Sequence, residues 1–494
     1  MLTFPDYLVI SSTVAILLLI AYFKGREESD TGDFFLGRRK IPGWAACFSF
    51  VATEISAMTI VGVPAVGFRE NWQYLQFFIG SALARIFIAY FFIPAFYKYD
   101  CTTVYEFLKH RFGPATQYSG SVFFFITRLL ASGVRLYAAS LAVSVIMGWS
   151  LPKTIGLFTI ISIAFIAFGG IKAVIWTGVF EASMFYIAGL GVVFYLLFNI
   201  RGNFFEFMKT AGEAGRLSVL NFGWNLKNPN ILWIAVLNGI FGSMAAFGTD
   251  QEMTQRLLTV DTRKTSQKTM VYTIFATLPL LLIYLGIGTL LFVFYRQNPS
   301  LPLPDNTDKI LSNFTVNVLP AGMKGLVLAA IIMASIDSPL SSLSSSFITD
   351  IYRPCLRRLA AAGMKTEKHY LLVSRFSVVF FGIILAAIAY FCKAAEGMLW
   401  LAFKINGVTA GSLLGVFLLG LFTSRKSNKA NVFAMILSSV LMAVLLVLSE
   451  KKIIALGWSW LIVFGTAITF GLGWLLAPVL DNERNSEIDG NLSA

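Results

Sequence analysis

Long apolar runs fill most of the chain, and they constrain its fold more than any other feature. A membrane-spanning helix needs roughly 20 apolar residues. About thirteen candidate runs follow one another, at 5–23, 44–68, 74–97, 120–148, 155–170, 173–199, 231–248, 267–295, 323–350, 369–392, 396–421, 428–448 and 454–477. Of the 494 residues, 57% are hydrophobic and 13% are charged, so a soluble domain of this composition would aggregate. The sequence therefore predicts an all-α polytopic membrane protein.

Charged and sulfur-containing residues exclude several function classes. The net charge of +13 is spread over short connectors, so we do not expect nucleic acid as a partner. The four cysteines lie far apart without a CxxC pair, and both histidines lie in connectors or at the edge of a run. We therefore expect neither an enzyme nor a bound cofactor.

Basic residues in the connectors predict the orientation of the chain in the membrane. The connectors 24–40 and 353–368 each carry five Lys or Arg residues, which places them in the cytoplasm. Asp6 precedes the first run, which has no cleavage pattern, so we expect a retained helix rather than a signal peptide. We expect an inner-membrane protein with the amino end outside and a disordered cytoplasmic tail at 480–494.

With residues in connectors and in the outer two turns of each span set aside, seven ionisable residues remain inside predicted spans, and Asp250 at the end of the seventh span is added to them. Each is costly at the centre of a bilayer unless it is paired or hydrated, so each is a candidate functional residue. The set comprises Glu54, Arg85, Arg128, Arg135, Glu181, Asp250, Asp337 and Lys404. The alternative is a structural ion pair, and this alternative is strongest for Arg85 and Glu181. Arg128, Ala131, Ser132 and Arg135 recur at helical spacing, which predicts one cationic face on the fourth span.

The ninth predicted span contains many hydroxyl groups. Residues 333–347 read MASIDSPLSSLSSSF, with seven serines, one aspartate and one proline. Sodium is a hard cation that takes several oxygen ligands, and serine hydroxyls with carbonyls freed by a helix break supply them. The alternative is a packing face, because small residues let helices approach closely.

Two spans have the composition of interrupted helices. In the second, Glu54, Ser56 and Thr59 break the apolar pattern before Gly62 and Pro64. The seventh ends FGSMAAFGTDQ at residues 241–251 and carries Gly239, Gly242 and Gly248, which weaken a helix. Weakened helices five spans apart, in two repeats, indicate a transporter binding site at the bilayer midplane.

Six segments resemble the sodium:solute symporter family in order along nearly the whole chain. They are 33–44 (DFFLGRRKIPGW), 52–65 (ATEISAMTIVGVPA), 102–113 (TTVYEFLKHRFG), 169–177 (GGIKAVIWT), 248–256 (GTDQEMTQR) and the serine-rich span ending in DIY at 350–352. The resemblance implies a LeuT-type core of two inverted five-helix repeats at 44–421. One helix and a loop at 1–43 precede this core, and two helices at 422–479 follow it.

The resemblance also implies a sodium site. Its ligands are the main-chain carbonyls of Ala52, Ile55 and Ile331 and the hydroxyl of Ser335. Ala334 stands where family members have a second hydroxyl, so Asp337 or Ser338 would have to compensate. Gly178 replaces an aspartate that several members carry, which argues against a second sodium site of the kind that the sialic acid branch has.

By the same resemblance, solute contacts come from spans two, three, four, seven and eleven. The residues nominated for solute binding are Glu54, Ser56, Thr59, Phe78, Arg128, Arg135, Ser243 and Lys404. The arginine that holds the carboxylate in the sialic acid transporter aligns with Ala131, between Arg128 and Arg135. Glu54 and Lys404 either bind the hydroxyls of a neutral sugar or form a pair that opens when the solute enters.

We therefore expect a sodium-coupled symporter that imports a small polar organic solute, such as a sugar or a sugar acid, by alternating access. Sodium, the solute and the lipid bilayer are the expected partners, and we expect a functional monomer. One alternative keeps this fold and couples to protons through Asp337. The other is a membrane sensor that does not transport.

Overall fold

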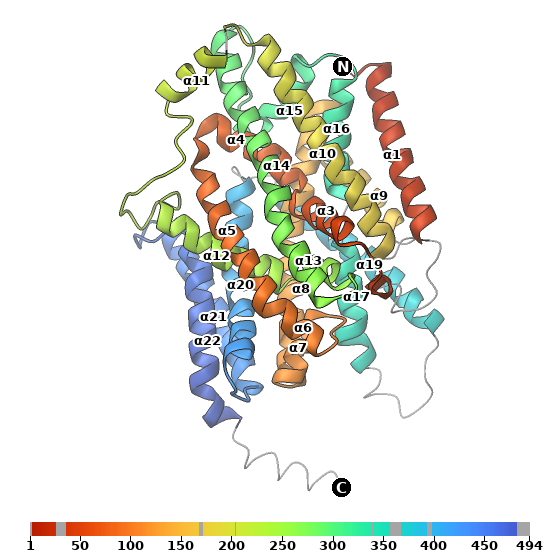
Figure 1. Cartoon of the computed structure of the whole chain (residues 1–494), viewed down its shortest axis with the longest axis vertical. Coiled ribbons are helices and arrows are strands. Elements are labelled where there is room, and N and C mark those ends of the chain that lie inside the picture. Colours follow the sequence, from red (N-terminus) through yellow and green to blue (C-terminus); the bar gives the residue numbers. More distant parts are fainter. Residues whose placement is uncertain are drawn as a thin grey trace.

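The computed structural model describes residues 2–25, 36–166, 171–202, 204–336, 339–355, 367–392 and 398–481. These residues form helices and connectors, with no strand among them. Figure 1 shows helix α1 (Phe4–Gly25) beginning at one end of the molecule and helix α22 (Trp460–Leu480) ending at the other. The predicted tail beyond Asp481 lies outside the described residues.

Within the described parts of the chain, nine continuous helical segments are long and apolar enough to cross a membrane. They are α1, the segment Trp72–Lys98 that contains α5 (Leu75–Phe87), α8 (Pro114–Met147), α10 (Ile171–Asn199), α14 (Arg263–Gln297), α19 (Glu367–Phe391), α20 (Met398–Phe422), α21 (Lys429–Glu450) and α22. Helices α9 (Leu151–Ile166) and α16 (Met323–Ile336) are apolar but shorter. The all-α membrane architecture is confirmed, while the count of about thirteen spans stays a prediction.

Two further spans are bent pairs, as the sequence predicted. Helices α3 (Gly43–Glu54) and α4 (Ala57–Arg69) meet at 62°, and α12 (Leu232–Gly248) and α13 (Gln251–Leu258) meet at 65°. The first joint lies at Ile55 and Ser56, whose backbone angles are not helical, whereas Pro64 lies inside α4. At the second joint the Asp250 side chain accepts a hydrogen bond from the Glu252 N–H (2.9 Å) and so caps α13.

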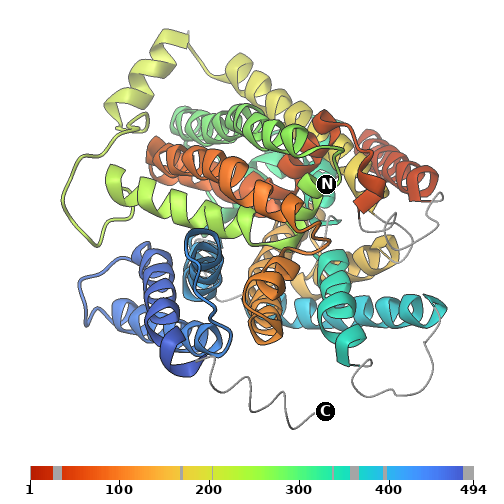
Figure 2. The same cartoon turned by 60° about the horizontal axis from the view of Figure 1, so that its bottom comes forward.

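Close glycine contacts bring the bent helices against α5 and α14. A Cβ on Gly288 of α14 would lie 2.3 Å from the Pro64 carbonyl oxygen of α4. A Cβ on Gly239 of α12 would lie 2.2 Å from the Phe77 carbonyl oxygen of α5. Figure 2 shows α14, α5 and α12 running side by side. In the predicted repeats, α3–α4 and α5 are the first two spans of one repeat, and α12–α13 and α14 are the first two of the other. The α4–α14 contact and the α12–α5 contact are then equivalent under the repeat symmetry.

Helix α1, which precedes the predicted repeats, is fastened to α16 by one carboxylate. The Oδ1 atom of Asp6 accepts hydrogen bonds from the N–H groups of Gly322 (2.7 Å) and Gly325 (2.9 Å). These groups lie at the amino end of α16, where a helix presents unpaired donors and a partial positive charge. Asp6 is therefore fully buried without an uncompensated charge.

Candidate functional site

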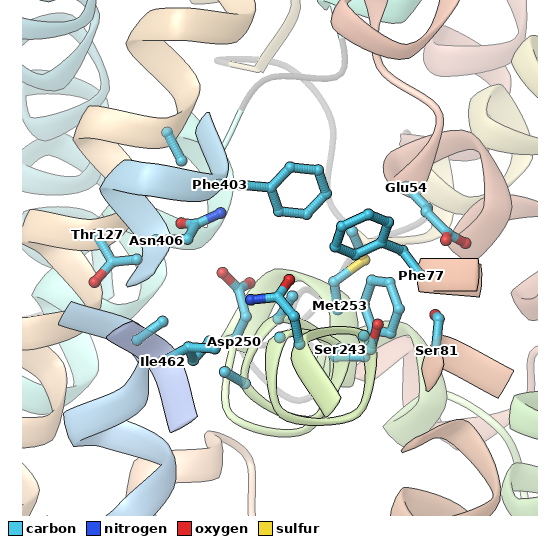
Figure 3. A pocket seen from close by; sticks show the side chains of 18 of the residues that line it. Glu54, Phe77, Ser81, Thr127, Ser243, Asp250, Met253, Phe403, Asn406 and Ile462 are labelled. Atoms are coloured by element: carbon cyan, nitrogen blue, oxygen red, sulfur yellow. The ribbon is translucent and has the colours of Figure 1, made fainter. Parts of the chain in front are cut away.

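A cavity of about 220 Å³ lies beside both helix joints. Its wall includes Glu54 and Thr59 at the first joint, Ser243 and Asp250 at the second, and Asn406 on α20. Figure 3 shows Glu54, Phe77 and Ser81 along one wall, with Thr127 and Asn406 along the opposite one. The joints contribute polar groups because a broken helix leaves backbone and side-chain groups free to face a cavity.

Aromatic side chains form part of the wall. Phe77 and Phe403 stack with ring centroids 6.0 Å apart, and Tyr74 lies 5.9 Å from Phe77. Trp400 and Trp458 join this cluster from outside the cavity wall, 5.9 Å and 6.3 Å from Phe77. A ligand pocket with aromatic walls and a few oriented polar groups is typical of small-molecule binding sites.

Two ion-pair clusters border the cavity. Arg128 forms ion pairs with Asp250 (3.3 Å) and, more closely, with Glu252. Glu54 forms an ion pair with Arg85, so the pairing alternative that the sequence raised for Arg85 is confirmed. Of the two alternatives for Glu54 and Lys404, a pair between them is wrong, because the Lys404 Nζ atom lies 2.8 Å from Glu450 Oε1, a carboxylate with a half-exposed side chain. Lys404 does not line the cavity.

Comparison with known proteins identifies the family of this chain. Residues 34–438 match the model of the Sodium:solute symporter family. The chain belongs to the sodium:solute symporter family. A sodium/sialic acid symporter of Proteus mirabilis (strain HI4320) is 30% identical, over 88% of this chain and 88% of its own length. A sodium/sialic acid symporter of Aliivibrio fischeri (strain ATCC 700601 / ES114) is 28% identical, over 99% of this chain and 96% of its own length.

A solved structure supports the same fold. The substrate-bound outward-open state of a Na⁺-coupled sialic acid symporter superposes with a TM-score of 0.86 at 26% identity, over 97% of this chain and 98% of the other. The symporter therefore has the LeuT-type fold that the resemblance implied. It is a sodium-coupled transporter of a small polar solute and not an enzyme.

A second, smaller cavity of about 40 Å³ lies next to the first joint of the symporter. Its wall includes Ala52 and Ser56 at that joint, Ser132 on α8, and Ala334 on α16. The Ser56 and Ser132 hydroxyls are buried, and among the described residues they have no hydrogen-bond partner. Buried hydroxyls are normally hydrogen-bonded, and a cavity of this size has room for one water molecule or ion.

Arg135 lines both cavities of the symporter. Its Nη1 atom donates to the carbonyl oxygen of Thr53, 3.4 Å away. Thr53 lies in the last turn of α3, where carbonyl groups have no partner within the helix. A cationic side chain thus separates the large cavity from the small one.

The structure brings together most of the predicted site residues. Glu54, Thr59, Phe78, Arg128, Arg135 and Ser243 line the large cavity, and Ser56 lines the small one. Of the predicted sodium ligands, Ala52 lines the small cavity, Ile55 lines the large one, and Ile331 is buried in α16. Ser335 is described by its backbone alone, and Asp337 and Ser338 lie outside the described residues.

Several cavity residues were absent from the predicted site. Asp250 is one of the charges at the end of a predicted span, but no sequence motif assigns it to a site. Phe77, Phe403 and Asn406 gave no usable signal, because the chain contains 46 phenylalanines and one asparagine in a span has no distinctive pattern.

Proposed function

We propose that this symporter imports a sugar acid, driven by inward sodium flow across the inner membrane. The observation that carries this proposal is the pair of neighbouring cavities with Arg135 in their shared wall. The large cavity has the size and mixed aromatic and polar wall that suit one small organic solute. The small cavity has the room and the uncharged oxygen groups that suit one hard cation.

Each part of the wall has a proposed role in holding the solute. Arg135 binds the carboxylate, because a guanidinium presents paired donors that match a carboxylate in geometry and charge. Glu54, Thr59, Ser243 and Asn406 bind hydroxyl groups, and Phe77 and Phe403 pack against the face of the sugar ring. The relatives that are named for sialic acid support an anionic sugar as the solute class.

Sodium is proposed to bind at the carbonyls of Ala52, Ile55 and Ile331 and the hydroxyl of Ser335, between the first joint and α16. Ser56 and Ser132 lie around the adjoining cavity, and they offer hydroxyls where Ala334 offers none. Sodium would hold α3 and α16 together and favour the state that binds the solute. Solute and sodium would then each raise the affinity for the other, because a coupling free energy acts in both directions.

The proposed organisation keeps residues 44–421 as the transport core of a functional monomer, with the amino end outside and the carboxyl end in the cytoplasm. The five basic residues in each of the connectors 24–40 and 353–368 support this orientation.

Thermal stabilisation of the purified symporter tests the proposal. A panel of sugars, sugar acids and amino acids is added in sodium, and again in potassium or choline. We expect sugar acids to raise the unfolding temperature in sodium only, because a ligand that binds the folded state stabilises it. Equal stabilisation without sodium, followed by uptake under a pH gradient alone, would instead support the proton-coupled alternative. Binding without any uptake into vesicles would support the sensor.

A further inference from the structure

Arg85 lies at the centre of an oxygen-lined cluster beside the large cavity. Its guanidinium is fully buried and forms an ion pair with Glu54, the last residue of α3. Its Nη1 atom donates to the hydroxyls of Thr273 (2.8 Å) and Thr277 (3.4 Å) on α14, and its Nε atom donates to Ser81 (3.5 Å) on its own helix. The Thr277 hydroxyl in turn donates to the other Glu54 oxygen (2.8 Å).

Three aromatic rings enclose the same guanidinium. Its Cζ atom lies 4.7 Å from the ring centroid of Phe247 and 5.8 Å from the centroids of Phe50 and Phe78. Ring faces attract a cation, and they exclude the water that would otherwise solvate it. The guanidinium is therefore held by one carboxylate, three hydroxyls and three rings, and it has no exposed surface.

Without the guanidinium, the remaining groups would leave a space lined by oxygen atoms. Both oxygens of Glu54 and the hydroxyls of Ser81, Thr273 and Thr277 are hard oxygen ligands, and they come from three helices. Hard monovalent cations take such oxygen ligands. A lone carboxylate at this depth would be costly unless a cation, a proton or water compensated it.

We infer that Arg85 is a resident cation, which permanently fills a site that would otherwise bind an exchangeable monovalent cation, and which fixes the first helix joint through Glu54. This cluster lies apart from the proposed sodium site. The Arg85 contacts connect α3 with α5 and α14, whereas the small cavity lies where α3 faces α8 and α16. The first helix joint is thus held on one side by the Arg85 guanidinium. On another side, if the proposed function is right, it is held by a sodium ion.

The ion pair with Arg85 also determines which interactions the Glu54 carboxylate can make with a solute. Glu54 lines the large cavity, and 16% of its side chain is exposed. Because Arg85 neutralises its charge, Glu54 can accept hydrogen bonds from hydroxyl groups without attracting cationic solutes. Removal of the guanidinium should therefore shift solute preference from polyhydroxylated compounds toward amines, in addition to opening the cation site.

Rescue by a free guanidinium ion tests this inference without a known solute. We expect purified Arg85→Ala to unfold at a lower temperature than the wild type, and millimolar guanidinium chloride to restore most of the lost shift, whereas tetramethylammonium chloride does not. The double variant Arg85→Ala/Glu54→Gln should lose this rescue, because it lacks the carboxylate. Lys404→Ala is the matched control, since it removes a cation from another carboxylate pair, whose partner Glu450 is half-exposed.

Several outcomes would overturn the inference. They are an Arg85→Ala protein as stable as the wild type, a rescue that persists in the double variant, and an equal response of Lys404→Ala. If Arg85→Ala does not accumulate in membranes, the double variant should accumulate, because it removes the uncompensated charge. Loss of both proteins would show that Arg85 does more than balance Glu54. None of these results depends on sodium coupling, so they are distinguishable from a failure of the proposed function.

Discussion

The guanidinium of Arg135 donates to the carbonyl oxygen of Thr53, and it lines the large and the small cavity at once. Under the proposed function, its positive charge would oppose a sodium ion in the small cavity. An anionic solute in the large cavity would compensate that charge and draw the guanidinium toward itself. If solute and sodium bind in these cavities, the position of this one side chain would provide a direct electrostatic route for coupling the two binding events.

Arg135→Gln is expected to uncouple the two ligands. In the wild type, a saturating sugar acid should raise the apparent sodium affinity by a factor of about 5 to 150, the usual range for such coupling. In the variant, sodium should bind more tightly without solute, because the opposing charge is gone, and the solute should change that affinity little. Sodium titrations of the purified protein with and without solute measure both effects. A variant that keeps the wild-type shift would exclude Arg135 as the coupling residue.

The hydroxyls around the small cavity provide a second test. Ser132→Ala should weaken sodium activation of uptake more than it alters solute selectivity, and Ser335→Ala should do the same. Ser140→Ala is the matched control, because Ser140 lies on α8 too, is buried, and has a hydroxyl without a described partner, yet lines neither cavity. Initial uptake rates over a range of sodium concentrations separate these effects. Equal sodium dependence in Ser132→Ala and Ser140→Ala would argue that the small cavity holds water only.

Sequence patterns predicted the interruption of both bent helices, because Glu54 breaks an apolar run and the seventh span carries Gly239, Gly242 and Gly248. The same patterns could not choose the partner of Glu54. Lys404 and Arg85 are both cations in predicted spans. Which of them points toward Glu54 depends on the rotation of each helix about its axis, because neighbouring positions on a helix differ by about 100° in direction. Phe403 and Asn406 face the cavity from α20, and Lys404 between them instead reaches Glu450.

Contacts between distant segments were also beyond sequence reasoning. The aromatic cluster combines Phe77 on α5, Phe403 on α20 and Trp458 just before α22, and no local spacing relates these residues. The same holds for Asp6, whose role as a cap appears only when α1 lies against α16. Family resemblance implied that carbonyls at the first joint bind sodium, and this stays a prediction. It could not predict that Arg135 would line two cavities at once.

Two glycines on α14 make a matched pair for testing the close helix contact. Gly288→Ala should destabilise the symporter by about 1–3 kcal/mol, as overpacking typically does, because its Cβ would lie 2.3 Å from the Pro64 carbonyl oxygen. Gly286→Ala should be neutral or slightly stabilising, since nothing lies within 4 Å of its Cβ and alanine favours helices. Thermal unfolding in detergent compares them directly. Equal stability of the two variants would contradict the close approach of α4 and α14.

Asp6→Asn tests how α1 is fastened to the helix that carries Ile331. Asparagine keeps the size and one acceptor, but it removes the negative charge that faces the amino end of α16. We expect a loss of about 1–2 kcal/mol, seen as a lower unfolding temperature, because hydrogen bonds to a charged acceptor are stronger than those to a neutral one. Glu213→Gln is the control, since its carboxylate lies 4.0 Å from the Lys209 Nζ atom and both side chains are mostly exposed. If both variants match the wild type, Asp6 does not hold α1 in place.

If Asp6→Asn also weakens sodium activation, then α1 supports the position of α16 at the sodium site, and this helix outside the repeats contributes to coupling.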